Sequence, residues 1–294
     1  MRYQQNKNHP LISIIIPTRN SEKVIPFCFK GIKQQNYPKD KIEVIVVDNE
    51  SSDNTIAYCK KNGAITLTVR GVPPLVCQQR NLGAKKAKAD YLLFLDHDME
   101  LSPNLLLNFA NKIEELNQDS NIKAWFIPER IVTSSNLLTK IRNFEREFYN
   151  CTVVDAVRII DKKTFFKTGQ YDPSLSGGPA DWDLDIQLKD VGCEFGTISE
   201  PLFHHEERLG GLTNYIKKKS DWTGGLEIYK LKWKKLHKGK YNHIINKQLG
   251  LSYRAFTVFF ENGKWKKTIR NPHLFLSVIL IKSMMLFLSK LKAK

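Results

Sequence analysis

The side chains best suited to chemistry are two carboxylates at the end of an apolar run. Residues 91–95 are typical of a buried strand, and Asp96 and Asp98 follow at once. Open α/β sheets bind their ligands where such strands end. Two acids there repel each other and favour a cation, and their hard oxygens suit Mg²⁺ or Mn²⁺ beside a phosphate-bearing substrate. The alternative is an ordinary strand end followed by solvated aspartates.

The surrounding sequence predicts the elements that would position these acids. Apolar runs typical of strands alternate with helical patterns over the first hundred residues, which predicts a mostly parallel sheet with helices on both faces. The predicted strands are residues 11–17, 42–47, 65–69 and 91–95, followed by 122–127, 153–160 and 195–198. The predicted helices are residues 21–35, 51–61, 76–88, 103–116, 136–149 and 181–191.

Charge is distributed unevenly along the 294 residues. Residues 1–210 hold 27 basic and 27 acidic side chains, whereas residues 211–294 hold 19 basic and 3 acidic ones and carry the whole net charge of +16. We therefore predict a neutral globular domain over residues 1–210, which carries the candidate catalytic carboxylates, and a basic helical region over residues 211–294. A segment this basic is expected to meet a membrane surface, a nucleic acid or an anionic substrate.

The last apolar stretch, residues 274–288, is 15 residues long and contains Lys282. Spanning a bilayer takes about 20 apolar residues, so this stretch is short for a transmembrane helix. It could pack on the domain, lie in the membrane interface or pair with a partner. The flanking basic residues favour the interface. Aromatic residues interleave with the lysines, as interfacial anchors do, although they could also be core residues: Trp222, Tyr229, Trp233 and Trp265.

Two further features bear on location. The five cysteines are scattered, lack metal-site spacing and are odd in number, which predicts free thiols in a reducing compartment. Residues 1–10 are polar and lack the apolar core of a secretory signal. We expect a cytoplasmic protein that is peripherally associated with the cell membrane.

Six short motifs follow one another in a characteristic order. They occupy residues 13–20, 48–53, 80–83, 96–98, 169–185 and 201–206. In this order and spacing the chain resembles the family 2 glycosyltransferases with the GT-A fold, over about residues 10–210. The resemblance implies a Rossmann-like, mostly parallel sheet flanked by helices and a nucleotide-diphosphate-sugar donor. The basic, partly apolar helical region would be a C-terminal extension of that fold.

The resemblance also assigns nucleotide-binding roles. Asp48 matches a residue that accepts a hydrogen bond from the base, usually uracil, although an Asp in this position can also simply cap a turn. Arg80 would lie near the nucleotide; otherwise it is a surface helix residue. Pro17 and Thr18 would offer backbone groups to the nucleotide, and Asp96 would face the ribose and the metal.

The resemblance further implies a metal site and a catalytic base. Asp96 and Asp98 match the Asp-x-Asp motif, with Asp98 the more direct ligand of Mn²⁺ or Mg²⁺. His204 would complete the site, with His205 as the alternative because adjacent strand residues point opposite ways. Asp181 matches the general base.

Two features qualify the assignment of the base. Ala180 stands where the family often has Glu, and Asp183 is the alternative base. A carboxylate at a helix N-terminus is also favoured for purely structural reasons. If the acceptor were an ionised lipid phosphate, no base would be needed.

These observations predict an inverting, metal-dependent glycosyltransferase that moves a single sugar, with a UDP-sugar the favoured donor. The Gln-x-x-Arg-Trp motif of processive synthases is absent. The favoured acceptor is lipid-linked, with another glycan possible, and the C-terminus would meet an anionic membrane. One alternative is a sugar nucleotidyltransferase, although residues 17–20 lack the glycines its phosphate loop needs. Another is a non-catalytic membrane- or nucleic-acid-binding protein on a degenerate GT-A fold. We expect no nucleic-acid partner because the positive charge lies outside the carboxylate-bearing part.

Overall fold

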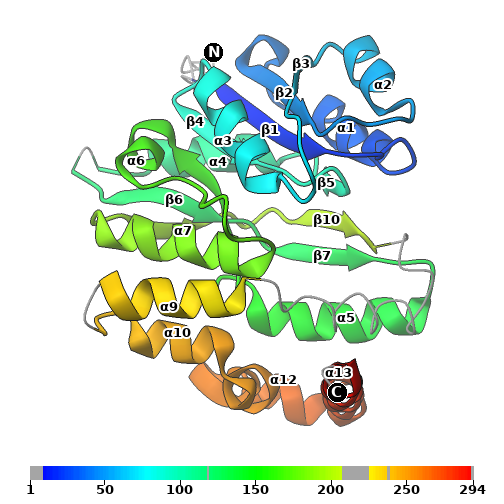
Figure 1. Cartoon of the computed structure of the whole chain (residues 1–294), viewed down its shortest axis with the longest axis vertical. Helices are drawn as coiled ribbons and strands as arrows, with labels where there is room; N and C mark the ends of the chain where they lie inside the picture. Colours follow the sequence, from blue (N-terminus) through cyan, green and yellow to red (C-terminus); the bar gives the residue numbers. More distant parts are fainter. Residues whose placement is uncertain (1–8, 118, 207–224, 237–238, 293–294) are drawn as a thin grey trace, which may run out of the picture.

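The computed structural model describes residues 9–117, 119–206, 225–236 and 239–292. Its centre is a seven-stranded sheet in the order β3-β2-β1-β4-β8-β6-β9 (Figure 1). β8 runs antiparallel to both of its neighbours and every other pair is parallel. The predicted mostly parallel α/β sheet is thus confirmed. The strands are β1 (Ile12–Thr18), β2 (Ile42–Asp48), β3 (Ile65–Thr68), β4 (Tyr91–Phe94), β6 (Ile122–Phe126), β8 (Val157–Asp161) and β9 (Glu194–Thr197).

Helices cover both faces of this sheet because the buried strands are apolar on both sides. In β1, Ile14 and Ile16 pack into one core layer and Ile15 into the other, following the two-residue period of a strand. The first layer includes α1 (Ile25–Lys33), α2 (Thr55–Lys61) and α4 (Leu105–Glu114). The second includes α3 (Val76–Lys86), α5 (Asn136–Tyr149), α6 (Lys162–Lys167) and α7 (Gly178–Asp190).

A second, three-stranded sheet was not predicted. It has the order β5-β10-β7, with β10 (Leu202–His205) antiparallel to β5 (Met99–Leu101) and parallel to β7 (Glu129–Val132). Strands of three or four residues are too short to show a periodic pattern. The pairing of β10 with β5 places His204 opposite Met99, the residue that follows Asp98 in the chain.

The strand predicted over residues 153–160 is shorter in the structure. It begins only at Val157, because the preceding residues form a turn. In that turn the Asp155 carboxylate accepts a hydrogen bond of 2.7 Å from the backbone of Cys151 and pairs with Arg146. The buried ion pair of Asp155 and Arg146 joins this turn to α5. The residues before Val157 therefore form a turn and not the first part of the predicted strand.

The C-terminal part is helical, as predicted, and lies at one end of the molecule (Figure 1). It contains α9 (Leu226–Leu236), α10 (Asn242–Leu249), the π-helical turn η3 (Tyr253–Thr257), α11 (Val258–Phe260), α12 (Trp265–Arg270) and α13 (Pro272–Lys292). α9 packs against α7, and α13 packs against α5. The predicted domain boundary at residues 210/211 lies outside the described residues.

The interfacial role expected for the C-terminal aromatic residues is wrong for two of them. Tyr229 and Trp233 are buried, and the indole of Trp233 donates a hydrogen bond of 2.8 Å to Asp183 of α7. They are core residues because α9 turns its aromatic side toward α7. Trp265 is exposed, and Trp222 lies outside the described residues.

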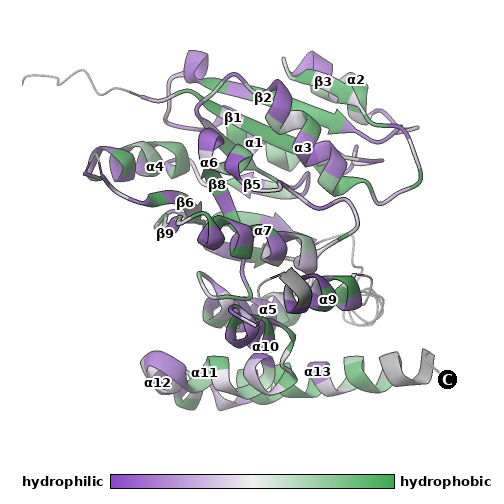
Figure 2. Cartoon of the chain, turned by 60° about the vertical axis from the view of Figure 1, so that its left-hand side comes forward, coloured by the Kyte–Doolittle hydropathy of each residue, from purple (hydrophilic) through white to green (hydrophobic). Residues whose placement is uncertain are grey.

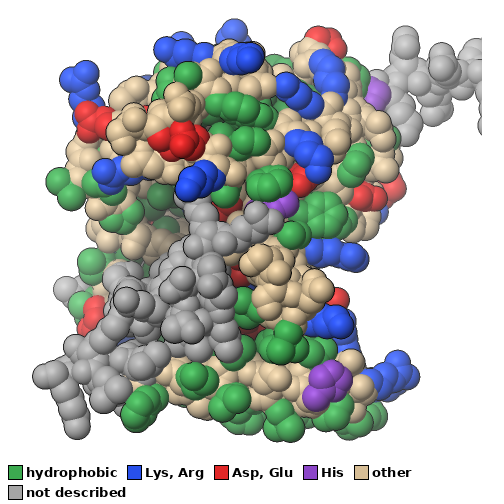
Figure 3. Space-filling view, turned by 90° about the vertical axis from the view of Figure 1, so that its right-hand side faces the viewer, with side chains coloured by type: hydrophobic (Ala, Val, Ile, Leu, Met, Phe, Trp, Pro, Cys, Tyr) green, Lys and Arg blue, Asp and Glu red, His purple; other side chains and the backbone are tan. Residues whose placement is uncertain are grey.

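α13 is apolar on two opposite sides. Val278 and Ile281 are buried, whereas Leu276, Leu280 and Phe287 are 64%, 62% and 65% exposed. Figure 2 shows the hydrophobic residues along α13, and Figure 3 shows hydrophobic side chains at the surface of the C-terminal helices. None of the helices in the described part of the chain combines the length and hydropathy that crossing a membrane requires.

Candidate active site

A cleft of about 840 Å³ begins at the carboxyl ends of β1 and β4 and continues between α5 and α13. Its polar end brings together residues that are distant in the sequence. Seven of the eight predicted site residues line it: Pro17, Thr18, Arg80, Asp96, Asp98, Asp181 and His204. The eighth, Asp48, lies just behind the lining.

Arg80 lies at the centre of this polar end. It comes from α3, which can approach β1 closely because Gly83 has no side chain; a Cβ there would clash with Ile15. The Arg80 side chain is buried, and its guanidinium donates to Asp96 at 2.8 Å and to Asp181 at 2.7 Å. The alternative of a surface arginine is therefore wrong.

A second arginine, Arg158 of β8, binds the other oxygen of Asp96 at 3.1 Å. Burial alone would raise the pKa of Asp96, but Arg80 and Arg158 lower it, so this carboxylate stays ionised. Arg80 and Arg158 thus partly offset the predicted repulsion between Asp96 and Asp98. Sequence reasoning missed Arg158, although an arginine inside the apolar run of residues 157–160 was a usable signal.

Asp98 and His204 lie side by side because β5 pairs with β10. The Nε2 atom of His204 is 3.5 Å from Oδ2 of Asp98, and its Nδ1 is 3.7 Å from Oε2 of Glu129. Burial alone would lower the pKa of His204, but the two carboxylates raise it to about 10. Nδ1 is buried and has no hydrogen-bond partner in the described structure.

This pair offers two of the ligands that a divalent cation needs. In the described residues, no three His, Cys, Asp or Glu side chains converge closely enough to hold a metal ion by themselves. Both oxygens of Asp96 already accept hydrogen bonds from arginines. The donor set fits an ion that takes a carboxylate and an imidazole from the protein and its remaining ligands from phosphates and water.

His205 points away from the cleft, as the alternation along a strand requires. Its Nε2 lies 2.8 Å from Oε2 of Glu100, and its ring stacks on Phe27 with 4.0 Å between the centroids. Of the two adjacent histidines, only His204 lines the cleft.

Asp181 lies in the first turn of α7, and its carboxylate lines the cleft. The helix begins after Gly177, whose φ of +58° favours glycine. The alternative base, Asp183, is fully buried on another side of α7. Its oxygens accept from Lys232 at 2.8 Å, Trp233 at 2.8 Å and Gln187 at 2.6 Å, which ties α7 to α9. Asp183 is therefore a structural residue.

The carboxylate of Asp48 is fully engaged at the end of β2. It accepts hydrogen bonds from the Thr18 hydroxyl at 3.0 Å and from the Ser51 hydroxyl and backbone at 2.5 and 2.8 Å. The next residue, Asn49, lines the cleft instead, and its Oδ1 is buried without a hydrogen-bond partner in the described structure. Sequence reasoning missed Asn49 as a candidate for contacting the base.

The end of the cleft near α13 carries charged groups that the sequence did not single out as site residues. Lys282 of α13 reaches inward and pairs with Glu145 at 2.6 Å, and Arg142 joins Glu145 to Glu206. Two signals were present: a charge in the middle of the last apolar stretch, and charges spaced by three residues along the inner face of α5.

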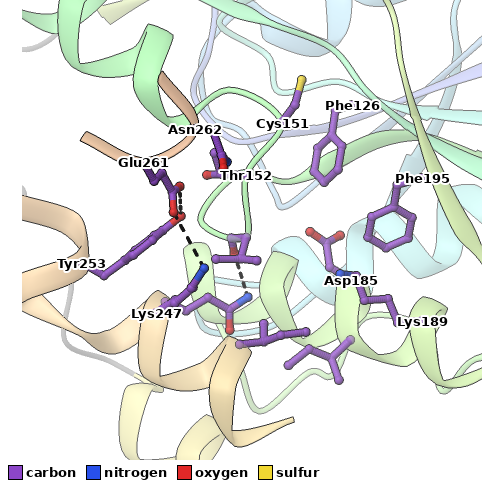
Figure 4. A pocket seen from close by; sticks show the side chains of 14 residues that line it. Phe126, Cys151, Thr152, Asp185, Lys189, Phe195, Lys247, Tyr253, Glu261 and Asn262 are labelled. Atoms are coloured by element: carbon purple, nitrogen blue, oxygen red, sulfur yellow. Dashed lines mark hydrogen bonds and ion pairs between the residues drawn. The ribbon is translucent and has the colours of Figure 1, made fainter. Parts of the chain in front are cut away.

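A smaller cavity of about 260 Å³ is lined by later residues of α7, Asp185, Ile186 and Lys189 (Figure 4). The buried carboxylate of Asp185 faces it from α7, beside Phe126 and Phe195. Opposite, Tyr253 donates a hydrogen bond of 2.7 Å to Glu261. None of the predicted site residues lines this cavity, so it is separate from the candidate site.

Comparisons with known proteins agree with this arrangement. The family model "Glycosyl transferase family 2" matches residues 13–170, more than half of the chain. The poly(ribitol-phosphate) beta-N-acetylglucosaminyltransferase TarS of Staphylococcus aureus is 33% identical over 114 residues, which are 36% of this chain and 19% of that protein. The chain thus aligns with about a fifth of this relative's length.

Solved structures share the fold over nearly the whole chain. The mannosyltransferase PcManGT of Pyrobaculum calidifontis, in complex with GDP-Man and Mn²⁺, superposes with a TM-score of 0.63 at 14% identity, covering 95% of this chain and 85% of that one. S. aureus TarS 1-349 in complex with UDP-GlcNAc gives 0.60 at 17% identity, covering 91% and 79%. At such identities the similarity shows the GT-A fold alone.

Proposed function

Because this chain belongs to glycosyl transferase family 2, we propose that it is an inverting, metal-dependent glycosyltransferase. It moves a single sugar from a nucleoside-diphosphate sugar, a UDP-sugar in our proposal, to a lipid-linked acceptor at the cytoplasmic face of the membrane. The observation that carries the proposal is the double contact of Arg80 with Asp96 and Asp181. Arg80 thereby joins Asp96, on the proposed donor side, to Asp181, whose carboxylate is suited to activating an acceptor hydroxyl.

Asp181 is the proposed base. It takes the proton of the acceptor hydroxyl while that oxygen forms its bond to the anomeric carbon and the bond from that carbon to the diphosphate breaks. A single displacement of this kind inverts the configuration. Arg80 holds the carboxylate in place, since one of its oxygens accepts the arginine's hydrogen bond and the other remains for the acceptor.

Asp98 and His204 are the proposed protein ligands of Mn²⁺ or Mg²⁺, with Asp96 beside them. When bound, the cation would neutralise the charge that develops on the departing diphosphate. The Mn²⁺ in the PcManGT complex supports a divalent cation in a protein of this fold. Arg158 and Arg80 keep Asp96 in a fixed orientation toward the donor side.

The nucleotide is proposed to lie beside Pro17 and Thr18, at the end of β1. The UDP-GlcNAc complex of TarS supports a uridine donor. Asp48 remains the proposed acceptor for the base N–H, and Asn49 is a second candidate because its buried Oδ1 has no partner in the described structure. A buried acceptor without a partner is unfavourable until a donor reaches it.

The lipid-linked acceptor is supported by the surface of the C-terminal helices. Leu276, Leu280 and Phe287 are exposed on the outer side of α13, and Phe256, Phe260, Trp265 and Ile269 are exposed nearby. The basic residues Lys264, Lys266, Lys267 and Arg270 lie within the same segment. Apolar side chains rimmed by lysines are typical of a membrane-surface contact. The name of the relative TarS suggests a second candidate acceptor, a poly(ribitol-phosphate).

Calorimetry tests the donor site most directly. UDP, GDP and CDP are titrated separately with and without Mn²⁺ into the wild-type protein and an Asp98→Ala variant. We expect Mn²⁺-dependent binding of UDP that the variant loses. Absence of binding for all three nucleotides would overturn the proposal and favour a non-catalytic protein.

Membrane association needs a different design. Deleting residues 241–294 would also remove the buried Val258 and Phe259, so the deletion would disturb the core. We instead expect the surface variant Leu276→Ser/Leu280→Ser/Phe287→Ser to lose co-flotation with anionic liposomes while still binding UDP. Undiminished flotation would exclude the outer face of α13 as the contact.

A further inference from the structure

We propose that the end of the cleft between α5 and α13 holds the hydrocarbon chain of an amphiphilic acceptor, and that Arg254 binds the phosphate of its head group. The proposal rests on the proposed function and names the substrate class of its acceptor side: a lipid whose phosphate anchors the head group, and whose head group also carries the hydroxyl that Asp181 deprotonates. We call this end the acceptor arm. Its apolar lining includes Ile141, Leu249, Leu251, Val278, Ile281 and Leu286.

The apolar side chains that line the acceptor arm range from buried to solvent-exposed. Ile141, Val278 and Ile281 are at most 7% exposed, whereas Leu251 is 50% and Leu286 39% exposed. All of them line the same continuous cleft as Asp181. A hydrocarbon chain can therefore pass from the surface toward the candidate base against apolar side chains.

Arg254 lies where the acceptor arm meets the polar end. Its guanidinium lies over the ring of Trp182, 5.7 Å from the centroid, and Trp182 directly follows Asp181. The Nε–H of Arg254 is buried without a hydrogen-bond partner in the described structure, and the Glu145 carboxylate, whose pKa this arginine helps to lower, already pairs with Lys282 and Arg142. Planar guanidinium groups bind phosphate well, so a phosphate here would satisfy a donor that is otherwise unpaired.

Tyr149 links the backbone of Arg254 to a second cation, Lys282. The Tyr149 hydroxyl donates to the Arg254 carbonyl at 2.6 Å and accepts from Lys282 at 2.7 Å. Lys282 is further held by Glu145. The tyrosine thus fixes the backbone that carries Arg254 and orients a lysine at the inner end of the arm.

These features favour a lipid phosphate over a polyol-phosphate polymer. The charged groups at this end of the cleft pair with one another, as Lys282 and Arg142 do with Glu145, whereas the remaining walls of the arm are mainly Leu, Ile and Val side chains. A polymer of hydroxyls and phosphates would lose hydration against such walls without gaining hydrogen bonds. The arm also lies along α13, whose outer face is the proposed membrane contact.

The test measures binding of hexadecyl phosphate and butyl phosphate to the full chain by calorimetry, below the aggregation concentration and without any nucleotide. Each buried methylene adds affinity, so we expect the long chain to bind at least about tenfold more tightly. Val278→Trp and Leu286→Trp, which fill the acceptor arm, should abolish that advantage. Leu280→Trp, on the outer face of the same helix, should retain it.

Equal binding of the two phosphates, unchanged binding in both arm variants, or loss in Leu280→Trp alone would overturn the proposal. Leu286→Trp is included because Val278 is buried and Val278→Trp could disturb folding. Leu286 is partly exposed, so a tryptophan there is better tolerated. Arg254→Gln should weaken hexadecyl phosphate at least about tenfold and leave hexadecanol binding unchanged. Equal weakening of both ligands would exclude a phosphate contact.

UDP titration separates this proposal from the proposed function. Lipid binding in the arm without any nucleotide binding would reject the glycosyltransferase mechanism, while the proposed lipid site in the acceptor arm would stand. Nucleotide binding together with equal affinity for the long and short phosphates would reject the arm alone.

Discussion

The guanidinium of Arg80 donates a hydrogen bond of 2.7 Å to Asp181, although 101 positions separate the two residues in the chain. Its other nitrogen donates to Asp96 at 2.8 Å. One side chain therefore joins the end of β4 to the first turn of α7. In the proposed reaction it couples the position of the donor-side acid to that of the base.

Replacing Arg80 should impair both folding and transfer. Arg80→Met leaves two carboxylates without their shared cation, and breaking a buried pair costs about 3–5 kcal/mol of unfolding free energy. Arg80→Lys should recover stability only in part, because an ammonium group cannot hold the two acids in one planar geometry. Urea unfolding and sugar-transfer rates measure both effects. Wild-type stability in Arg80→Met would contradict the structure.

Removing the proposed base should affect chemistry more than binding. We expect Asp181→Asn to lower kcat by about 10²–10⁴-fold while the Kd for UDP with Mn²⁺ stays within a few-fold of the wild type. Asp183→Asn is the matched control on the same helix. It should lower the Tm, because Lys232 and Trp233 lose their partner, while the folded fraction keeps most of its activity. A reversed pattern would identify Asp183 as the base.

The two adjacent histidines allow a paired test of the metal site. His204→Ala should weaken Mn²⁺-dependent UDP binding by at least about tenfold, because a proposed ligand is lost. His205→Ala should leave metal dependence unchanged and reduce stability, since it removes the contacts with Glu100 and Phe27. Titrating EDTA into the UDP complex of each variant gives the comparison. Equal loss in both would argue against His204 as a ligand.

Base recognition can be divided between two neighbours at the end of β2. If Asn49 contacts the base, Asn49→Ala should weaken UDP binding by the free energy of one hydrogen bond, about 1–3 kcal/mol. It should also reduce the preference for UDP over CDP. Asp48→Ala removes the proposed acceptor for the base N–H and should lower UDP affinity, and it should also lower stability because the Asp48 oxygens cap the following turn through Thr18 and Ser51. Should Asp48→Ala abolish discrimination in a protein of normal stability, Asp48 reads the base.

The pair of Lys282 and Glu145 predicts a pH dependence of stability. Burial alone would raise the pKa of Glu145, but Lys282 and Arg142 lower it. A lowered pKa in the folded state stabilises the protein above the ordinary Glu pKa of about 4.3, and the contribution is lost as the pH falls below that value.

Lys282→Met should therefore destabilise the protein at pH 7 and make the loss of stability on acidification shallower. The exposed pair of Lys112 and Glu115 provides the control, since Lys112→Met should change stability by less than about 1 kcal/mol. Urea unfolding at pH 7 and pH 4 tests both. Identical acid slopes in the wild type and Lys282→Met would exclude the pair as a contributor.

The sequence by itself determined the α/β class and most of the larger elements. Continuous apolar runs and helical spacing are local patterns, and α5 begins and ends at the predicted residues. The resemblance to the family 2 glycosyltransferases placed Pro17, Arg80 and Asp96 at one nucleotide site, and the structure brings all three into one cleft.

Only the tertiary structure decided how charges pair and which face each side chain takes. Arg158 reaches Asp96 across neighbouring strands, His204 rather than His205 faces the cleft, and Trp233 is buried where α9 packs on α7. The short strands of the second sheet show no period of their own and form only where three distant segments meet. Local patterns arise from interactions between near neighbours in the chain, whereas ion pairs and burial depend on distances that exist only after the chain has folded.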